Sequence, residues 1–150
     1  MKQIVIATDG SPSATEAVDV GLELAQEQGA EVTFVHVTTP DEYAVSRLGP
    51  GHPIPRHEPI DESEIALTAA GEAAKEAGVP YALERISGDA VDTIVAVGDA
   101  KNADLIVVGS RGLGPVRAAL LGSVSRGVLD DAQRPVLIVK TEKVLAGVES

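Results

Sequence analysis

One stretch of the sequence, residues 104–125, combines residue types that can bind a phosphate group. Its distinctive members are three spaced glycines and the two serines that follow the last of them: Gly109, Gly112, Gly122, Ser123 and Ser125. Glycine lets backbone N–H groups approach an anion closely, and the start of a helix presents unpaired N–H groups and the positive end of its dipole. An apolar strand, a glycine-rich loop and a hydroxyl-bearing helix start therefore predict a nucleotide site here.

The distribution of charge favours an anion in the same region. The chain has 23 acidic and 12 basic residues and a net charge of −11. Residues 105–129 nevertheless contain no Asp or Glu, and they contain Arg111, Arg117 and Arg126. A cationic segment in an acidic chain is where a phosphate would bind. The overall negative charge disfavours nucleic acid and anionic membrane surfaces as partners.

The better-known phosphate and catalytic motifs are absent from the sequence. No Gly-Lys-Ser/Thr ends a P-loop, and Asp9-Gly10-Ser11, after the first apolar run, lacks the glycines of a dinucleotide-binding turn. Neither a G-x-S-x-G elbow nor an H-E-x-x-H helix occurs. Because the chain has no cysteine, disulfides, thiolate catalysis and cysteine-ligated metal sites are excluded.

Five short apolar runs alternate with segments of helical periodicity, and this order predicts the scaffold. The expected strands are Gln3–Thr8, Glu31–Val37, Tyr81–Ile86, Leu105–Val108 and Val136–Val139. The expected helices begin at Ser11 or Ser13, at Asp61, at Asp89 and near Gly122. Such alternation indicates an α/β fold of the Rossmann-like kind, a five-stranded parallel sheet with helices on both faces. We expect the strand order 3-2-1-4-5, with the third strand at an edge.

Length and composition predict a single domain over residues 1–150, with an irregular proline-rich loop at 38–59 and a short tail at 141–150. The sequence is 44% apolar but only 2% aromatic, so its core must consist of aliphatic side chains. No apolar run approaches the ~20 residues of a membrane helix. No leader pattern occurs at the start. We therefore expect a cytoplasmic protein without a membrane partner.

Ligands of such sheets bind beyond the carboxyl ends of the strands, where the winding reverses. If the first and fourth strands are neighbours, Asp9-Gly10-Ser11 and the glycine segment face one crevice. Each residue alone also has a purely structural interpretation. Asp-Gly is a common turn pair, and Ser123 by itself would serve as a helix cap.

The spacing Gly109-x2-Gly112-x9-Gly122-Ser123 resembles the ATP-binding signature of the universal stress protein family. Supporting segments are Thr8-Asp9-Gly10-Ser11, His36-Val37, Gly88-Asp89 and the strand that begins at Pro135. The resemblance covers about residues 2–140 and implies an adenine nucleotide alpha-hydrolase-like fold. It also implies ATP or another adenine nucleotide as ligand, with Mg²⁺, and a homodimer formed through Val136–Val139. An unpaired apolar edge strand is independently a pairing surface.

The resemblance further implies a role for individual residues. Those beside the adenosine part would be Ala7, Thr8, Asp9, Val37 (through its backbone), Val108 and Gly109. Those around the phosphates would be Arg111, Gly112, Gly122, Ser123, Val124 and Ser125, through backbone N–H groups and hydroxyls. Metal ligands stay unassigned.

The first expectation is a nucleotide-dependent regulatory module of the stress response, with no catalytic residue. A slow Mg²⁺-dependent ATPase or phosphotransfer enzyme on the same fold is an alternative. Arg111 or Arg117 would then supply the cation and Asp9 would hold Mg²⁺, but no base is evident. A nucleotide-free interaction protein is the second alternative.

Overall fold

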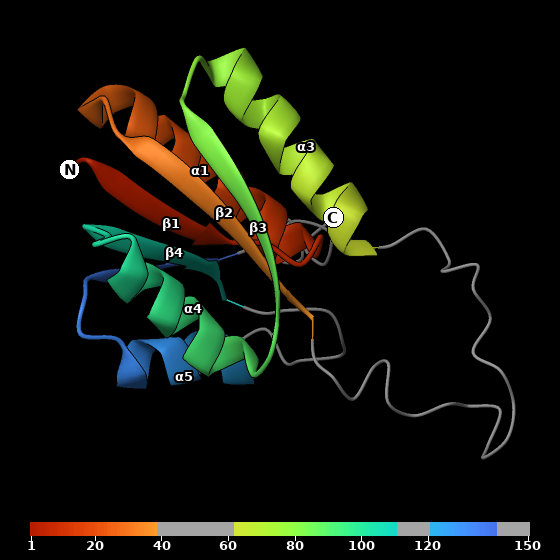
Figure 1. The fold of residues 1–150 in the computed structure, drawn as a ribbon, viewed down its shortest axis with the longest axis vertical. Coiled ribbons are helices and arrows are strands. Elements are labelled where there is room, and N and C mark those ends of the chain that lie inside the picture. The colour runs from red at the N-terminus through yellow and green to blue at the C-terminus, as the bar shows by residue number, and fades with distance from the viewer. Residues whose placement is uncertain (39–61, 111–120, 141–150) are drawn as a thin grey trace, which may run out of the picture.

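The computed structural model describes residues 1–38, 62–110 and 121–140. Its strands form one parallel sheet in the order β3-β2-β1-β4-β5 (Figure 1). The strands are β1 (Gln3–Ala7), β2 (Glu31–Thr38), β3 (Tyr81–Ser87), β4 (Leu105–Gly109) and β5 (Val136–Val139). The helices are α1 (Pro12–Gln28), α3 (Glu62–Ala77), α4 (Ala90–Ala100) and α5 (Ser123–Asp131). The predicted fold class and strand order are confirmed.

Helices cover both faces of the sheet, with α1 and α3 on one side and α4 and α5 on the other (Figure 1). Successive residues of a strand point to opposite faces, so β1 contributes to two cores. Ile4 and Ile6 pack with Phe34 on the side of α1 and α3. Val5 packs with Val35 on the side of α4 and α5. Branched aliphatic side chains thus fill most of the interior.

Side chains cap two of the helices at their starts. Ser11 is the cap of α1, because its Oγ accepts a hydrogen bond from the Ala14 N–H at 3.1 Å, and this settles the choice between Ser11 and Ser13. Pro12 is the first helical residue, where its missing N–H costs nothing. Asp89 caps α4 in the same way, with 2.9 Å from its Oδ2 to the Asp92 N–H.

Four strand ends differ by one residue from the expectations, since β1 ends at Ala7 and β2, β3 and β4 each run one residue further. Strand β2 runs to Thr38, which the sequence pattern placed in the loop; the rest of that loop and the tail at 141–150 lie outside the described residues. Helical spacing predicts an apolar face of α3 that includes Ile65 and Ala69, yet both are exposed. Leu67 and Gly71 are buried instead.

The orientation of α3 has a packing cause. The Cβ that Gly71 lacks would lie 3.1 Å from the ring of Tyr81, so the helix turns its smallest residue toward β3. Ala66, Ala70 and Ala74, at four-residue spacing, line the same buried side. The close approach of helix to sheet therefore rotates Ile65 outward, where 56% of it is exposed.

Candidate functional site

Strand β1 stops before the neighbours on either side of it. Its pairing with β2 ends at Ala7 opposite Val35, while β2 continues to Thr38. On the other side β4 continues to Gly109, beyond its last pair with β1, which joins Val107 to Ile6. The carboxyl edge of the sheet therefore has an indentation at the end of β1, which is the place where ligands of such folds bind.

Backbone groups from both neighbours face this indentation. Alternate residues of a strand direct their N–H and C=O toward the same side. The Val35 carbonyl accepts from the Thr8 N–H at 2.9 Å on the β1 side, so Val37 directs its backbone groups to that side too, past the end of β1. The Ser110 N–H donates to a β5 carbonyl, so the preceding residue, Gly109, faces the β1 side. Two predicted site residues thus present backbone donors and acceptors to the same place.

The chain leaves β1 through a tight turn that Asp9 stabilises. Asp9 Oδ1 accepts a hydrogen bond from the Ser11 N–H at 2.8 Å. Gly10 has a φ of +82°, which a residue with a Cβ rarely adopts. The Cβ position of Gly10 lies 3.6 Å from the Cβ of Ala66, so the first turns of α3 lie beside this loop. That contact could not be predicted from the sequence, because helical periodicity does not identify a helix's neighbours.

Two of the predicted residues near the ribose have structural roles. A Cβ at Gly109 would lie 2.7 Å from the backbone carbonyl carbon of Ser13, so this glycine allows α1 to approach β4. The side chain of Val108 is 2% exposed and belongs to the core beneath α4 and α5. Any contact that these two make with a ligand would have to use the backbone.

A buried junction at Ser110 joins the end of β4 to the start of α5. The Ser110 carbonyl accepts from the Gly122 N–H at 2.7 Å and from the Ser125 Oγ at 3.0 Å. The structure therefore brings Gly109 together with Gly122–Ser125, the outer parts of the glycine spacing. Arg111 and Gly112, its middle part, lie outside the described residues.

The start of α5 has no side-chain cap. Its N-cap residue is Gly122, and no side chain hydrogen-bonds to the N–H groups of the first turn within the described part of the chain. Ser123 and Val124 are exposed, whereas Ser125 is buried. Ser123 is the first helical residue rather than the cap. Free N–H groups at a helix start, on an exposed turn, form an anion-binding geometry.

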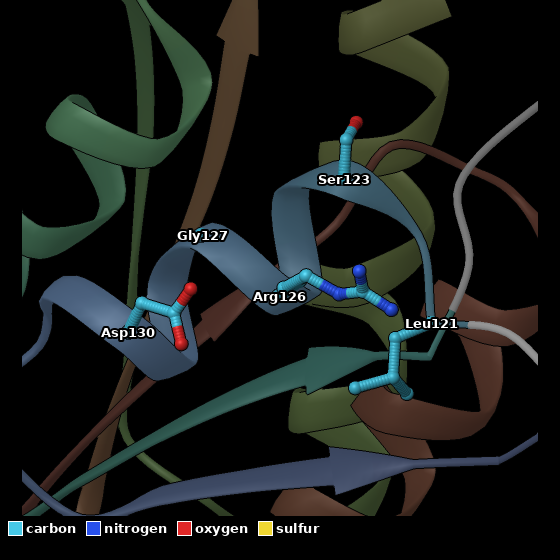
Figure 2. A pocket seen from close by; sticks show the side chains of 5 residues that line it. All are labelled: Leu121, Ser123, Arg126, Gly127 and Asp130. Atoms are coloured by element: carbon cyan, nitrogen blue, oxygen red, sulfur yellow. The ribbon is translucent and has the colours of Figure 1, made fainter.

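A shallow hollow lies along the first two turns of α5. Its lining residues are Leu121, Ser123, Arg126, Gly127 and Asp130 (Figure 2). Arg126 extends toward Leu121 there and forms no ion pair with a residue in the described ranges (Figure 2). The charge pattern of the sequence included Arg126 in the cationic segment but assigned it no contact.

The described residues include no group of three His, Asp or Glu side chains placed to hold a metal ion. Among the four described helices, none combines the length and the apolar character that crossing a membrane requires.

Known proteins share the sequence and fold. The profile of the universal stress protein family matches residues 1–140. YxiE, a universal stress protein of Bacillus subtilis, is 35% identical over 145 residues, covering 92% of this chain and 98% of that protein. A crystal structure of a universal stress protein in complex with cAMP is 30% identical, with a TM-score of 0.71 over 93% of this chain and 97% of that one. The universal stress protein from Archaeoglobus fulgidus in complex with dAMP is 26% identical, with a TM-score of 0.69 over 93% and 98%. The chain belongs to the universal stress protein family.

Proposed function

We propose that this protein binds an adenine nucleotide at the carboxyl edge of the sheet, with the phosphate on the first turn of α5. One observation carries the proposal. Gly122 has φ −66° and ψ 161°, and the capping Ser11 of α1 has φ −67° and ψ 159°. Since this conformation is open to ordinary residues, the backbone does not require glycine at 122. Glycine there leaves the N–H groups of the helix start to an external anion.

The base and ribose would lie beyond the end of β1. Backbone groups of Val37 and Gly109 face that position from opposite sides, and backbone donors and acceptors suit the edge of an adenine ring. Two similar structures are complexes with cAMP and dAMP, which share the adenine base and one phosphate. Ala7, Thr8 and Asp9 would line the adenosine side.

A longer nucleotide belongs to the same proposal. Further phosphates of ATP, with Mg²⁺, would extend from the helix start into the cationic segment, whose residues 105–129 include three arginines and no acid. Arg111 and Gly112 would contribute to this part of the site. The protein would then act as a stress-response module whose nucleotide occupancy regulates its interactions.

A homodimer through β5 completes the proposal. This strand is an edge of the sheet, its sequence Val-Leu-Ile-Val is uncharged, and three of its four residues are only half-buried. An apolar edge with unpaired backbone groups pairs readily with a second copy. Sedimentation velocity of the purified protein tests this, and a single species at the monomer mass across the concentration range would contradict it.

Isothermal titration calorimetry tests the nucleotide proposal. We expect binding heat with AMP, cAMP and ATP·Mg²⁺, and weaker binding of adenosine, which lacks the phosphate. UMP is the matched control, because it carries the same phosphate on a different base. Absence of both heat and thermal shift with every adenine nucleotide would refute the proposal. Equal binding of UMP and AMP would refute only the placement of the base.

A further inference from the structure

Ser125 lies in the exposed first turn of α5, but its hydroxyl points into the protein. The residue is 2% exposed. Its Oγ lies 3.0 Å from the Ser110 carbonyl oxygen and 3.0 Å from the Gly122 carbonyl oxygen. A hydroxyl carries one proton, which here is shared between two internal acceptors. The donor is therefore already used, and the group is shielded from any ligand outside.

The acceptor at Ser110 is itself held firmly. Its N–H donates to the Val139 carbonyl of β5 at 2.8 Å, and its carbonyl accepts the Gly122 N–H at 2.7 Å. Ser110 is also buried. One residue thus ties the edge strand to the start of α5, and the Ser125 hydroxyl adds a second connection from the helix to the same oxygen.

Ser123 provides the contrast within the same turn. Its side chain is exposed and stands out at the head of the helix (Figure 2). Its hydroxyl has no hydrogen-bond partner among the residues that the structure describes. Of the two serines, only Ser123 presents its hydroxyl on the exposed surface at the helix start.

We propose that the Ser125 side chain is a positioning group for the phosphate site and that its hydroxyl does not touch the nucleotide. Its hydroxyl holds the first turn of α5 against Ser110, and this sets the direction of the free N–H groups that receive the phosphate. The resemblance to the family implied a different role, in which this hydroxyl closes the cradle around the phosphates. The inference rests on the proposed nucleotide site.

The experiment compares Ser125→Ala with Ser123→Ala, the same loss of one hydroxyl two residues away. AMP affinity is measured by calorimetry, and hydrogen exchange of the Gly122 amide is measured by NMR in nucleotide-free protein. We expect Ser125→Ala to lower the affinity for AMP at least tenfold, which corresponds to about 1.4 kcal/mol of binding free energy. It should also speed exchange of the Gly122 amide at least tenfold. Ser123→Ala should leave that exchange unchanged, whatever its effect on AMP.

Both readouts are needed to separate positioning from contact. Weaker AMP binding by Ser125→Ala with unchanged Gly122 exchange would mean direct contact and would overturn the inference. Faster exchange with unchanged AMP affinity would overturn it as well. Ser125→Thr keeps the hydroxyl and should recover the affinity to within threefold; a folded threonine variant as weak as alanine would contradict the inference. If the wild-type protein binds no adenine nucleotide, the proposed function fails and this inference fails with it, whereas failure in the variants alone leaves the function intact.

Discussion

The helices α1 and α5 begin with almost the same backbone conformation, but only α1 has a side-chain cap. Ser11 and Gly122 differ by no more than 2° in φ and ψ, and both precede helices at the carboxyl edge of the sheet. The Ser11 hydroxyl caps the start of its own helix, and the residue is 1% exposed. Gly122 brings no such group, and the turn that follows it is exposed.

The difference indicates what each helix start is for. An N-cap side chain satisfies N–H groups that would otherwise need water or a ligand. The start of α1 is capped by Ser11 and the start of α4 by Asp89, so neither needs a ligand to satisfy the capped N–H group. The uncapped start of α5 gives up that stabilisation, and we infer that a bound phosphate supplies it instead. Variants that exchange the two arrangements test this directly.

The largest effect is expected when α5 receives an acidic cap. In Gly122→Asp, the carboxylate would accept from the first-turn N–H groups and repel phosphate. AMP affinity should fall at least 100-fold, about 2.8 kcal/mol. The nucleotide-free protein should become slightly more stable, by about 0.5–1 kcal/mol, because the helix gains a cap and the unfolded chain loses a glycine. Calorimetry and thermal unfolding measure the two effects.

A neutral cap distinguishes the effect of the cap's hydrogen bonds on AMP affinity from the effect of its charge. Gly122→Ser places at α5 the residue that caps α1. It should give a similar gain in stability with a smaller loss of AMP affinity, because serine does not repel the phosphate. If both variants bind AMP as wild type does, the phosphate does not lie at this helix start.

The second effect concerns the contact that holds α1 beside β4. In Gly109→Ala the new Cβ would lie 2.7 Å from a backbone atom of Ser13, which cannot rotate away. Overpacking of this kind costs about 1–3 kcal/mol. Because the end of β4 must shift, we expect a lower unfolding temperature together with weaker AMP binding.

Gly29→Ala is the matched control for Gly109→Ala. Gly29 ends α1 with φ +65°, and its Cβ position has no atom within 4 Å. The alanine there should cost about 1 kcal/mol through backbone strain alone. Its AMP affinity should stay at the wild-type value. Unchanged AMP binding by a folded Gly109→Ala protein would show that the end of β4 is not part of the site.

A smaller effect is expected at the capped helix start. Ser11→Ala removes the hydroxyl that accepts the Ala14 N–H. The loss of an N-cap costs about 1 kcal/mol, which lowers the unfolding temperature of a chain of this length by about 2–4 °C. AMP affinity should change less than threefold, because this start serves the fold. A large loss of affinity without loss of stability would remove the distinction between the two helices.

The sequence predicted the parts of the fold and site that depend on local pattern. Alternating apolar runs and helical segments led to the parallel sheet, and the glycine spacing led to the start of α5. The N-cap of α1 stayed open between Ser11 and Ser13, because both serines fit a local capping pattern. Only the position of the Ala14 N–H decides between them.

Features that depend on contacts between distant segments could not be predicted. The glycine at 109 was assigned to a ligand, yet a Cβ there would also clash with the side chain and backbone of Ser13, far away in the sequence. Likewise, nothing local reveals that the Ser125 hydroxyl turns toward Ser110. The same limit explains the rotation of α3, whose exposed Ile65 fits the helical period as well as the buried Leu67 does.

The smallest effect is expected at the opposite edge of the sheet, where a carboxylate bonds to a strand rather than to a helix start. Asp104 Oδ2 accepts from the Lys2 N–H at 2.6 Å and from the Gln3 N–H at 3.1 Å. These two hydrogen bonds lower the pKa of Asp104 below its usual 3.8. A carboxyl whose pKa is lower in the folded than in the unfolded state stabilises the fold at pH values above its unfolded-state pKa. This contribution disappears as the pH falls through the folded-state pKa.

Asp104→Asn should therefore unfold at a slightly lower temperature than wild type at pH 7. This difference in unfolding temperature should narrow as the pH falls below 3.8 and vanish once the wild-type carboxyl is protonated. Thermal unfolding from pH 7 down to about 2.5 measures the difference, with Asp19→Asn on the exposed side of α1 as control. A constant difference at all pH values would mean that the carboxylate charge contributes nothing. AMP affinity should be unaffected, since a site confined to the carboxyl edge gains nothing from a carboxylate at the amino edge.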